Sequence, residues 1–325
     1  MEAQVGIYQI FGEIGRGSSG SVHTAKNTQN NQELCVKIIE KSSMNTKEDI
    51  EFFRREVSIL SALQHKNIAE YHDLLEDSNN YYLFQELCQG ENLTKYLENN
   101  RPISERQIEI IFHQFCSALS YIHKAGVGHR DLKPDNIIIG ANNIVKIIDF
   151  GLSTDDNQHL RTTFCGSLAY AAPECIRREP YIAWRSDMWS LGVILFQMNT
   201  GRLPWKTSNI VQLMKQITSG NFEIPPSIPA PIKNIIVQCL NQDPTLRPSA
   251  DDLIGVRFTR PEEPKLPRRS MSPRATVKRT SSNPFFTGAP QYVQPPISPR
   301  MNPSPQRRFS QTWIKPLTNL KDASD

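Results

Sequence analysis

The stretch that decides the fold reads His129-Arg130-Asp131-Leu132-Lys133-Pro134-Asp135-Asn136, and Asp149-Phe150-Gly151 follows it shortly afterwards. The interval between them, 137–148, is Ile-Ile-Ile-Gly-Ala-Asn-Asn-Ile-Val-Lys-Ile-Ile. Two β-branched runs around a Gly-Ala-Asn-Asn turn predict a β-hairpin. Because a hairpin brings its two ends together, we expect Asn136 and Asp149 to face one site.

These residue types suit phosphoryl transfer. That reaction needs a carboxylate beside the attacking hydroxyl, and oxygen ligands for the magnesium ion on the nucleotide. Asp131 is the candidate for the first role, and Asn136 and Asp149 are the candidate metal ligands. His-Arg-Asp or Asp-Phe-Gly alone would indicate little, so the prediction rests on their combination and spacing.

A glycine-rich stretch lies upstream, Gly15-Arg16-Gly17-Ser18-Ser19-Gly20-Ser21-Val22. Dinucleotide-binding folds use a similar motif, but they follow the glycines with a helix. Here alternating apolar stretches at 8–14 and 22–26 flank the motif and predict strand, turn and strand. We therefore interpret the motif as a flap over phosphates, in which the candidate nucleotide contacts are Gly15, Gly17, Gly20 and Val22.

Lys37 interrupts the β-branched strand predicted at 33–39, which is costly unless its charge is matched. It either grips phosphates or points to solvent, and its position after the glycine stretch favours the first. Its expected partner is Glu56, on a helix predicted over 47–63; alternatively, Glu56 pairs with an arginine of its own helix. The apolar positions expected to form the buried stripe of this helix are Phe52, Phe53, Val57, Ile59, Leu60 and Leu63.

Together these features resemble a eukaryotic serine/threonine protein kinase across residues 8–258. Further matches are Ala172-Pro173-Glu174, Asp187-Met188-Trp189-Ser190-Leu191-Gly192 and Arg247, in the order of that family. Lys133 after Asp131 is the serine/threonine pattern. Within the family, the stretch 163–174 is similar to the calcium/calmodulin-dependent and AMP-activated kinase group.

The resemblance implies an α+β bilobal fold. A small antiparallel-sheet N-lobe with one helix would span about 8–87, and a larger, mainly helical C-lobe about 88–258. The residues themselves predict the central helix of the C-lobe, which a capping box opens at Ser104. A second, buried helix is predicted near 187–198.

The resemblance also implies an enzyme that uses ATP and Mg²⁺ to phosphorylate Ser and Thr hydroxyls of protein substrates. Asp131 would accept the hydroxyl proton, and Lys133 would steady the transferred phosphoryl group. Asn136 and Asp149 would bind magnesium, and Lys37, held by Glu56, would fix the nucleotide. A scaffold with kinase shape is the alternative, although such proteins generally lack one of these residues and none is missing here.

Other roles follow from the same resemblance. Backbone groups of Glu86 and Cys88 would bind adenine, Cys35 would lie over it, Ile138 would form the floor of the pocket, and Gln85 would hold the gatekeeper position. Asp187 would bind the backbone of the catalytic loop, which is the stretch 129–136. Glu174 and Arg247 would form a buried ion pair. Ser167 would contact Asp131 and Lys133.

Thr163 is the expected site of activating phosphorylation, because its phosphate could bind Arg130 and order the loop that contains Thr163. Thr162 is the rival site, and a constitutively ordered loop is the alternative. The phosphate would come from an upstream kinase or from trans-autophosphorylation.

The bulk composition fits an intracellular protein. The chain has 325 residues, 38% of them hydrophobic, and a mean hydropathy of −0.46, with no apolar run of membrane-spanning length. Its six cysteines have no paired spacing, so we expect neither zinc nor disulfides. We expect a cytoplasmic location, leave a nuclear one open, and expect no membrane contact.

Residues 259–325 are expected to be a disordered, basic, Pro/Ser-rich tail. From position 260 the sequence has 12 Lys+Arg and 4 Asp+Glu, so this part carries +8 while the remainder carries −4. Nucleic-acid binding by the tail is disfavoured, because it lacks the regular aromatic residues of a stacking surface.

Overall fold

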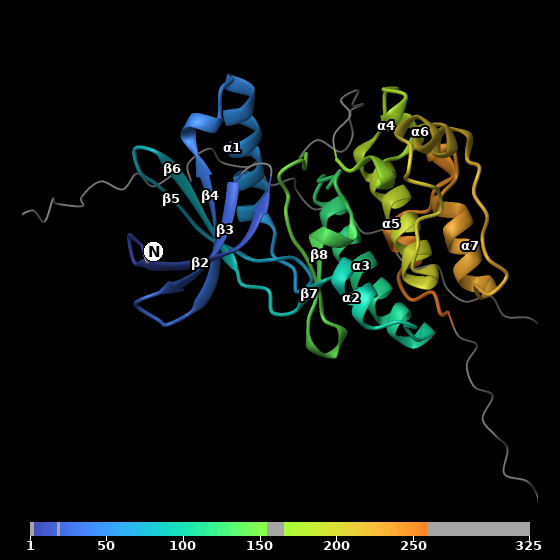
Figure 1. The fold of residues 1–325 in the computed structure, drawn as a ribbon, viewed down its shortest axis with the longest axis horizontal. Helices are drawn as coiled ribbons and strands as arrows, with labels where there is room; N and C mark the ends of the chain where they lie inside the picture. Colours follow the sequence, from blue (N-terminus) through green and yellow to red (C-terminus); the bar gives the residue numbers. More distant parts are fainter. Residues whose placement is uncertain (1–2, 18–19, 155–165, 259–325) are drawn as a thin grey trace, which may run out of the picture. The chain divides into compact units, whose positions relative to one another are not determined.

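A six-stranded antiparallel sheet forms the first part of the fold (Figure 1). The computed structural model describes residues 3–17, 20–154 and 166–258. The strands pair in the order β1-β2-β3-β4-β6-β5, so each neighbour except β4–β6 follows along the chain. Their bounds are β1 Ala3–Val5, β2 Tyr8–Gly17, β3 Gly20–Asn27, β4 Glu33–Glu40, β5 Tyr71–Glu76 and β6 Asn80–Glu86.

Helix α1, Lys47–Ala62, follows a short 3-10 helix at Lys41–Ser43 and packs against β5. A capping box between Thr46 and Asp49 opens it. The predicted stripe is buried except for Phe52, which is 52% exposed. The prediction for Phe52 was therefore wrong: Ile59, seven positions later and on nearly the same side of the helix, is buried, so periodicity does not separate the two, and Phe52 is exposed because this side is covered only farther along the helix.

The hairpin predicted between Asn136 and Asp149 is confirmed. Strands β8, Ile137–Ile139, and β9, Val145–Ile147, pair antiparallel, and β7, Glu91–Asn92, adds to β8. Asn142 and Asn143 adopt φ of 57° and 58° in the turn, a conformation that asparagine tolerates well. The amide of Ile148 donates to the carbonyl of Asn136 at 2.9 Å, which closes the hairpin beside both candidate metal ligands.

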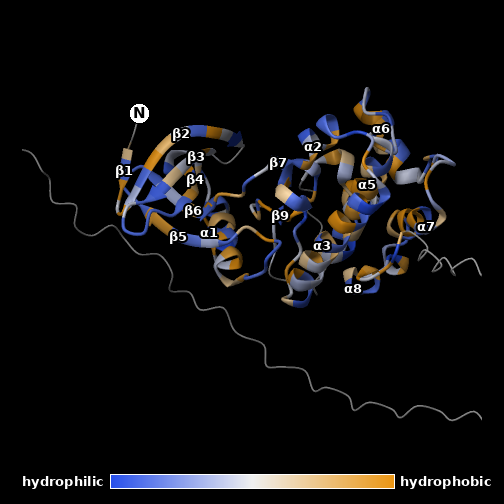
Figure 2. Cartoon of the chain, turned by 90° about the horizontal axis from the view of Figure 1, so that it is seen from below, coloured by the Kyte–Doolittle hydropathy of each residue, from blue (hydrophilic) through white to orange (hydrophobic). Residues whose placement is uncertain are grey.

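Helices make up most of the second part. The predicted Ser104 capping box opens α3. The apolar residues that recur at helical spacing along it are buried: Ile108, Ile111, Phe112, Phe115, Leu119 and Ile122. Helix α5 is buried on most faces, as predicted, but begins at Ala183, four residues before Asp187. Figure 2 shows hydrophobic and hydrophilic residues mixed along α3. The helices are α2 Leu93–Asn99, α3 Glu105–Lys124, α4 Pro173–Ile176, α5 Ala183–Thr200, α6 Ile210–Ser219, α7 Ala230–Cys239 and α8 Ala250–Leu253, with 3-10 turns at Pro134–Asn136, Ala141–Asn143, Leu168–Tyr170 and Pro244–Leu246.

The arrangement confirms the predicted fold class: an antiparallel sheet with one long helix, followed by a mainly helical part. No helix in the described part of the chain is long and apolar enough to cross a membrane. The predicted disorder of 259–325 lies outside the described residues, as does the loop 155–165.

Candidate active site

Asp131 is held from two sides by the residues predicted to act with it. Lys133 Nζ lies 2.7 Å from Asp131 Oδ2 and 3.1 Å from Ser167 Oγ. The amide of Ser167 donates to Asp131 Oδ1 at 2.9 Å. Ser167 therefore contacts both residues as predicted, although its backbone and not its hydroxyl reaches Asp131. This network fixes the carboxylate and the ammonium group side by side.

Gly166 makes this approach feasible. Its φ is +88°, and a Cβ there would lie 2.6 Å from the carbonyl oxygen of Arg130 and 3.0 Å from Asp131 Oδ1. A side chain would thus push the segment at 166–167 away from the catalytic loop. The role of Gly166 was not predicted from the sequence, because a positive φ leaves no signal beyond the glycine itself.

The two candidate metal ligands have different neighbours: Asn136 lies beside Asp131, and Asp149 lies beside Lys37. Asn136 Nδ2 donates to the Asp131 carbonyl at 2.9 Å, so its donor side is committed to the loop. Among the described residues, no group donates to its Oδ1. Asp149 is 47% exposed at its side chain, and Lys37 is 3.6 Å from its Oδ1.

This donor set fits magnesium. Mg²⁺ prefers oxygen ligands and is often held by one or two carboxylates together with substrate phosphates. Within the described residues no three His, Cys, Asp or Glu side chains form a metal cluster. The amide oxygen of Asn136 and the carboxylate of Asp149 therefore suit a magnesium ion that is also bound by the phosphates of the nucleotide.

Lys37 joins Glu56 to Asp149. Its Nζ is 2.9 Å from Glu56 Oε1 and 3.6 Å from Asp149 Oδ1. Burial alone would lower the pKa of Lys37, but the charges of Glu56 and Asp149 outweigh burial and raise it. Burial would likewise raise the pKa of Asp149, yet Lys37 and His129 lower it. Lys37 is thus a cation and Asp149 a carboxylate near neutral pH.

Val22, Cys35 and Lys37 share one face of the sheet. Val22 pairs with Lys37 in the β3–β4 register, and residues directly opposite each other point to the same side. Cys35 is two residues before Lys37, and Gln85 lies opposite Cys35 on β6. The predicted nucleotide contacts on β3 and β4 and the gatekeeper therefore point to the same side of the sheet as Lys37.

The residues at the end of β6 and just beyond it were predicted to bind adenine through their backbone groups. The amide of Glu86 donates to the Glu70 carbonyl, while the Glu86 carbonyl accepts from the thiols of Cys35 and Cys88. The backbone amide of Cys88 has no partner among the described residues. Ile138 lies on β8, opposite Asn92 and Lys146.

Lys146 makes a contact with Glu86 that was not predicted from the sequence. Its Nζ is 2.6 Å from Glu86 Oε2, and this oxygen also accepts from the backbone amide of Glu70. Residue 146 alternates with buried neighbours on β9, a pattern that predicts exposure but no partner. The pair joins the end of β6 to β9, the strand that precedes Asp149.

The glycines of the flap differ in what surrounds them. Gly20 has φ +147°, and a Cβ there would lie 2.1 Å from the Ile38 carbonyl oxygen, so the fold itself requires glycine. A Cβ at Gly15 would meet nothing within 4 Å, and at Gly17 only the Gly20 carbonyl at 4.0 Å. The fold therefore gives no steric reason for glycine at Gly15 or Gly17.

Asp187 supports the catalytic loop as predicted. It accepts from the backbone amides of His129 and Arg130, each at 2.8 Å, and it lies 2.9 Å from His123 Nε2. Burial would raise the pKa of Asp187, but the His123 hydrogen bond and nearby charges lower it. The carboxylate thus organises the two residues before Asp131.

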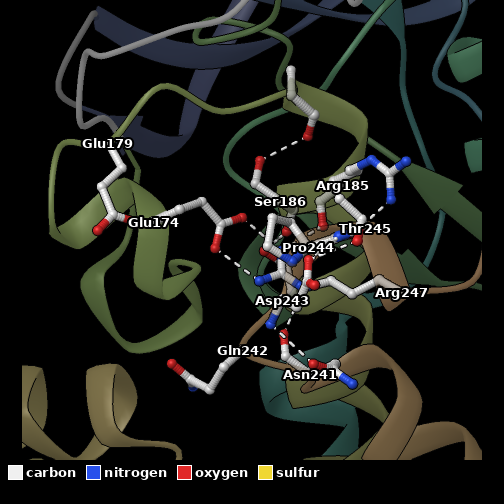
Figure 3. A network of polar contacts seen from close by, with 12 residues as sticks. Glu174, Glu179, Arg185, Ser186, Asn241, Gln242, Asp243, Pro244, Thr245 and Arg247 are labelled. Atoms are coloured by element: carbon white, nitrogen blue, oxygen red, sulfur yellow. Dashed lines mark hydrogen bonds and ion pairs between the residues drawn. The ribbon is translucent and has the colours of Figure 1, made fainter.

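The predicted buried ion pair of Glu174 and Arg247 is also confirmed (Figure 3). Arg247 Nη1 and Nη2 donate to the two carboxylate oxygens at 2.6 and 2.7 Å. Further bonds reach the carbonyls of Asn241 and Arg185. The pair fixes the start of α4 to the segment after α7.

Thr163 and its rival Thr162 lie outside the described residues. Arg130 is described: its guanidinium donates to Tyr181 Oη at 3.0 and 3.2 Å and to the Leu152 carbonyl at 3.4 Å. Tyr181 was not anticipated from the sequence.

The protein kinase domain family matches residues 8–259, so the chain belongs to the protein kinase family. The predicted resemblance to the calcium/calmodulin-dependent and AMP-activated group is confirmed by the relatives. Maternal embryonic leucine zipper kinase, which this sequence also resembles, is one of them.

Three relatives have similar identities. CBL-interacting serine/threonine-protein kinase 26 of Arabidopsis thaliana is 32% identical over 78% of this chain and 59% of its own length. Sperm motility kinase 2A of Mus musculus is 33% identical over 76% and 48%, respectively. Maternal embryonic leucine zipper kinase of Xenopus tropicalis is 33% identical over 76% and 38%. The chain thus spans less than two thirds of each relative.

Proposed function

We propose that this protein is a serine/threonine protein kinase that transfers the γ-phosphate of Mg-ATP to hydroxyl groups of protein substrates. The observation that carries the proposal is the Asp131–Lys133 pair, 2.7 Å apart and beside Asn136. A general base and a cation for the transferred group are the two parts that phosphoryl transfer needs next to the substrate hydroxyl.

In this proposal Asp131 orients the substrate hydroxyl and accepts its proton. Lys133 steadies the charge on the transferred phosphoryl group, and Ser167 holds Lys133 in place. Magnesium, when bound through Asn136 and Asp149, would neutralise phosphate charge. The whole arrangement acts mainly through positioning and electrostatics.

ATP would be held by the sheet face that carries Val22, Cys35 and Lys37. Lys37 would bind phosphates, since Glu56 keeps its ammonium group fixed. Adenine would bond to the Cys88 amide and, in place of the weak thiol donors, to the Glu86 carbonyl, above Ile138. Gly15, Gly17 and Gly20 would let the flap backbone approach the phosphates.

We also propose that phosphorylation of Thr163 activates the enzyme, by an upstream kinase or by trans-autophosphorylation. The support is Arg130, a guanidinium next to Asp131 that could bind a phosphate. Undiminished activity of a Thr163→Ala protein would contradict this part. The domain limits 8–258, the basic tail and an intracellular location remain predictions.

A degenerate peptide library with Ser, Thr or Tyr acceptors tests the activity. With radiolabelled γ-phosphate we expect transfer to Ser and Thr peptides, dependent on Mg²⁺. Transfer to Tyr alone would overturn the acceptor class, and transfer without any divalent ion would overturn the metal role.

A further inference from the structure

Two cysteines from different segments converge on one oxygen atom. Cys35 Sγ, on β4, is 3.4 Å from the Glu86 carbonyl oxygen, and Cys88 Sγ is 3.7 Å from the same oxygen. The two distances add to about 7 Å, which is the upper limit on the separation of the sulfur atoms. Both residues are partly exposed.

Strand pairing explains the convergence. Cys35 lies opposite Gln85 in the β4–β6 register, so its side chain stands beside the last residues of β6. Cys88 lies two residues beyond Glu86, where the chain has left the strand. A carbonyl oxygen has two lone pairs, so Glu86 can accept from both thiols at once.

The pair is poorly suited to ordinary thiol chemistry. Burial raises the pKa of Cys35 to about 11. Burial, then the charge of Glu86, raises the pKa of Cys88 to about 12, and Cys35 itself contributes. Since the thiolate is the nucleophile, alkylating agents that modify one thiol at a time and peroxides should react slowly with Cys35 and Cys88.

A disulfide makes the narrower demand on the pair, because it requires sulfur atoms about 2 Å apart and a specific dihedral angle. One soft atom inserted between the sulfurs relaxes this demand, since it lengthens the bridge. The reagent that supplies this atom must bind two thiols at once, and its reaction must not require thiols that are already deprotonated.

We propose that Cys35 and Cys88 form a dithiol site for trivalent organoarsenic oxides. The arsenic atom forms one bond to each sulfur, and the arsenic–oxygen bond breaks. The two thiol protons leave with that oxygen as water. Arsenic remains trivalent, so no oxidant or reductant is needed.

The site has a functional consequence that rests on the proposed function. A bridging group would sit at the Glu86 carbonyl, which is the proposed partner of adenine. Nucleotide and arsenical would then exclude each other. A kinase so modified would lose ATP binding while its catalytic loop stayed intact.

Another cysteine pair in the described part of the chain is a weaker candidate. Cys239 contributes to the raised pKa of Cys116, but both residues are fully enclosed in the core. A rigid aryl arsenical could not reach them without unfolding. Cys175 is also buried, at 6% exposure.

The test uses phenylarsine oxide and intact-mass spectrometry of the full chain. We expect one arsenical per chain, linking the Cys35 and Cys88 peptides, released by a dithiol but not by a monothiol. Cys35→Ala and Cys88→Ala should each lose affinity by about a hundredfold, because the second bond is no longer intramolecular. Cys165→Ala is the matched control and should bind as the wild type does.

Wild-type affinity in either single variant, or its loss only in the control, would overturn the dithiol site. Thermal melting shows whether each variant is folded, and Cys35→Ser supplies a second variant if Cys35→Ala is not. Displacement of Mg-ATP by phenylarsine oxide is measured in a separate experiment. An arsenical that binds without displacing nucleotide would keep the dithiol site but overturn its place at the adenine position.

Discussion

Lys37 on β4 and Glu56 on α1 meet at 2.9 Å, although the two residues are nineteen positions apart in the sequence. Their side chains are only 12% and 7% exposed. A buried ion pair of this kind contributes little net stability, because desolvation offsets the attraction. Its value here is positional: Glu56 holds the ammonium group 3.6 Å from Asp149.

Replacing Glu56 by Gln should therefore impair catalysis more than folding. Without the carboxylate, Lys37 can shift toward Asp149, and a displacement of about 1 Å can cost about 10²-fold in rate. We expect kcat/KM to fall by about that factor while the melting temperature changes little, because Gln keeps the volume and an acceptor oxygen of Glu56 and Asp149 still compensates the charge of Lys37. The matched control is Glu51→Gln, on the exposed face of α1. Equal losses in both variants would contradict the assigned role of Glu56.

The flap glycines should separate folding from binding. Gly20→Ala places a Cβ against the Ile38 carbonyl at a positive φ, and we expect a destabilisation of about 1–3 kcal/mol. Gly15→Ala meets no atom, so its free energy of unfolding should stay within about 0.5 kcal/mol of the wild type. Its KM for ATP should nevertheless rise. Denaturant unfolding and ATP titration measure the two effects; an unstable Gly15→Ala would refute the distinction.

Removing one partner of the Glu174–Arg247 pair should be severe. Glu174→Ala leaves a buried guanidinium without its carboxylate, which costs about 3–5 kcal/mol. Glu179→Ala is the control, because its contact with Arg177 is 3.7 Å long and half exposed, a type of pair worth about 0–1 kcal/mol. Chemical denaturation of both variants decides the matter, and similar values would count against this account.

The low pKa of Asp187 predicts a pH-dependent contribution to stability. A carboxylate with a pKa lowered by folding stabilises the folded state above its unfolded pKa, about 3.9, and this stability is lost as the pH falls below it. Asp187→Asn should cost about 3 kcal/mol near neutral pH, because a loop amide and His123 lose a charged acceptor.

The difference between wild type and Asp187→Asn should shrink as the pH falls from about 4 toward the lower pKa of the folded state. Unfolding curves at several pH values measure it. Asp135→Asn, at an exposed carboxylate of the loop that Asp187 supports, is the control. A difference that grows on acidification would show that the sign is wrong.

Local pattern carried most of the fold prediction. The hairpin, both strands of the flap, α1 and the capped start of α3 follow from periodicity and turn residues that act over short range. Phe52 failed because a run of two phenylalanines does not say which one faces the core. The early start of α5 has no capping side chain to mark it.

The candidate site was predictable where its residues sit in motifs, as for Asp131, Asn136 and Asp149. It was not predictable where a contact joins distant segments through a single side chain. Lys146 with Glu86, and Tyr181 with Arg130, are of that kind, because nothing local to either residue indicates its partner. The convergence of Cys35 and Cys88 likewise depends on register between strands.

The proposed phosphate transfer requires the Asp131 carboxylate in the reaction itself and not only for maintaining the conformation of the loop. The most direct measurement compares initial rates of γ-phosphate transfer to Ser/Thr peptides by the wild type and by Asp131→Asn, with Mg-ATP affinity measured on both. The account predicts that Asp131→Asn binds Mg-ATP as the wild type does and transfers phosphate at least about 10²-fold more slowly. Equal transfer rates at equal nucleotide affinity would contradict it.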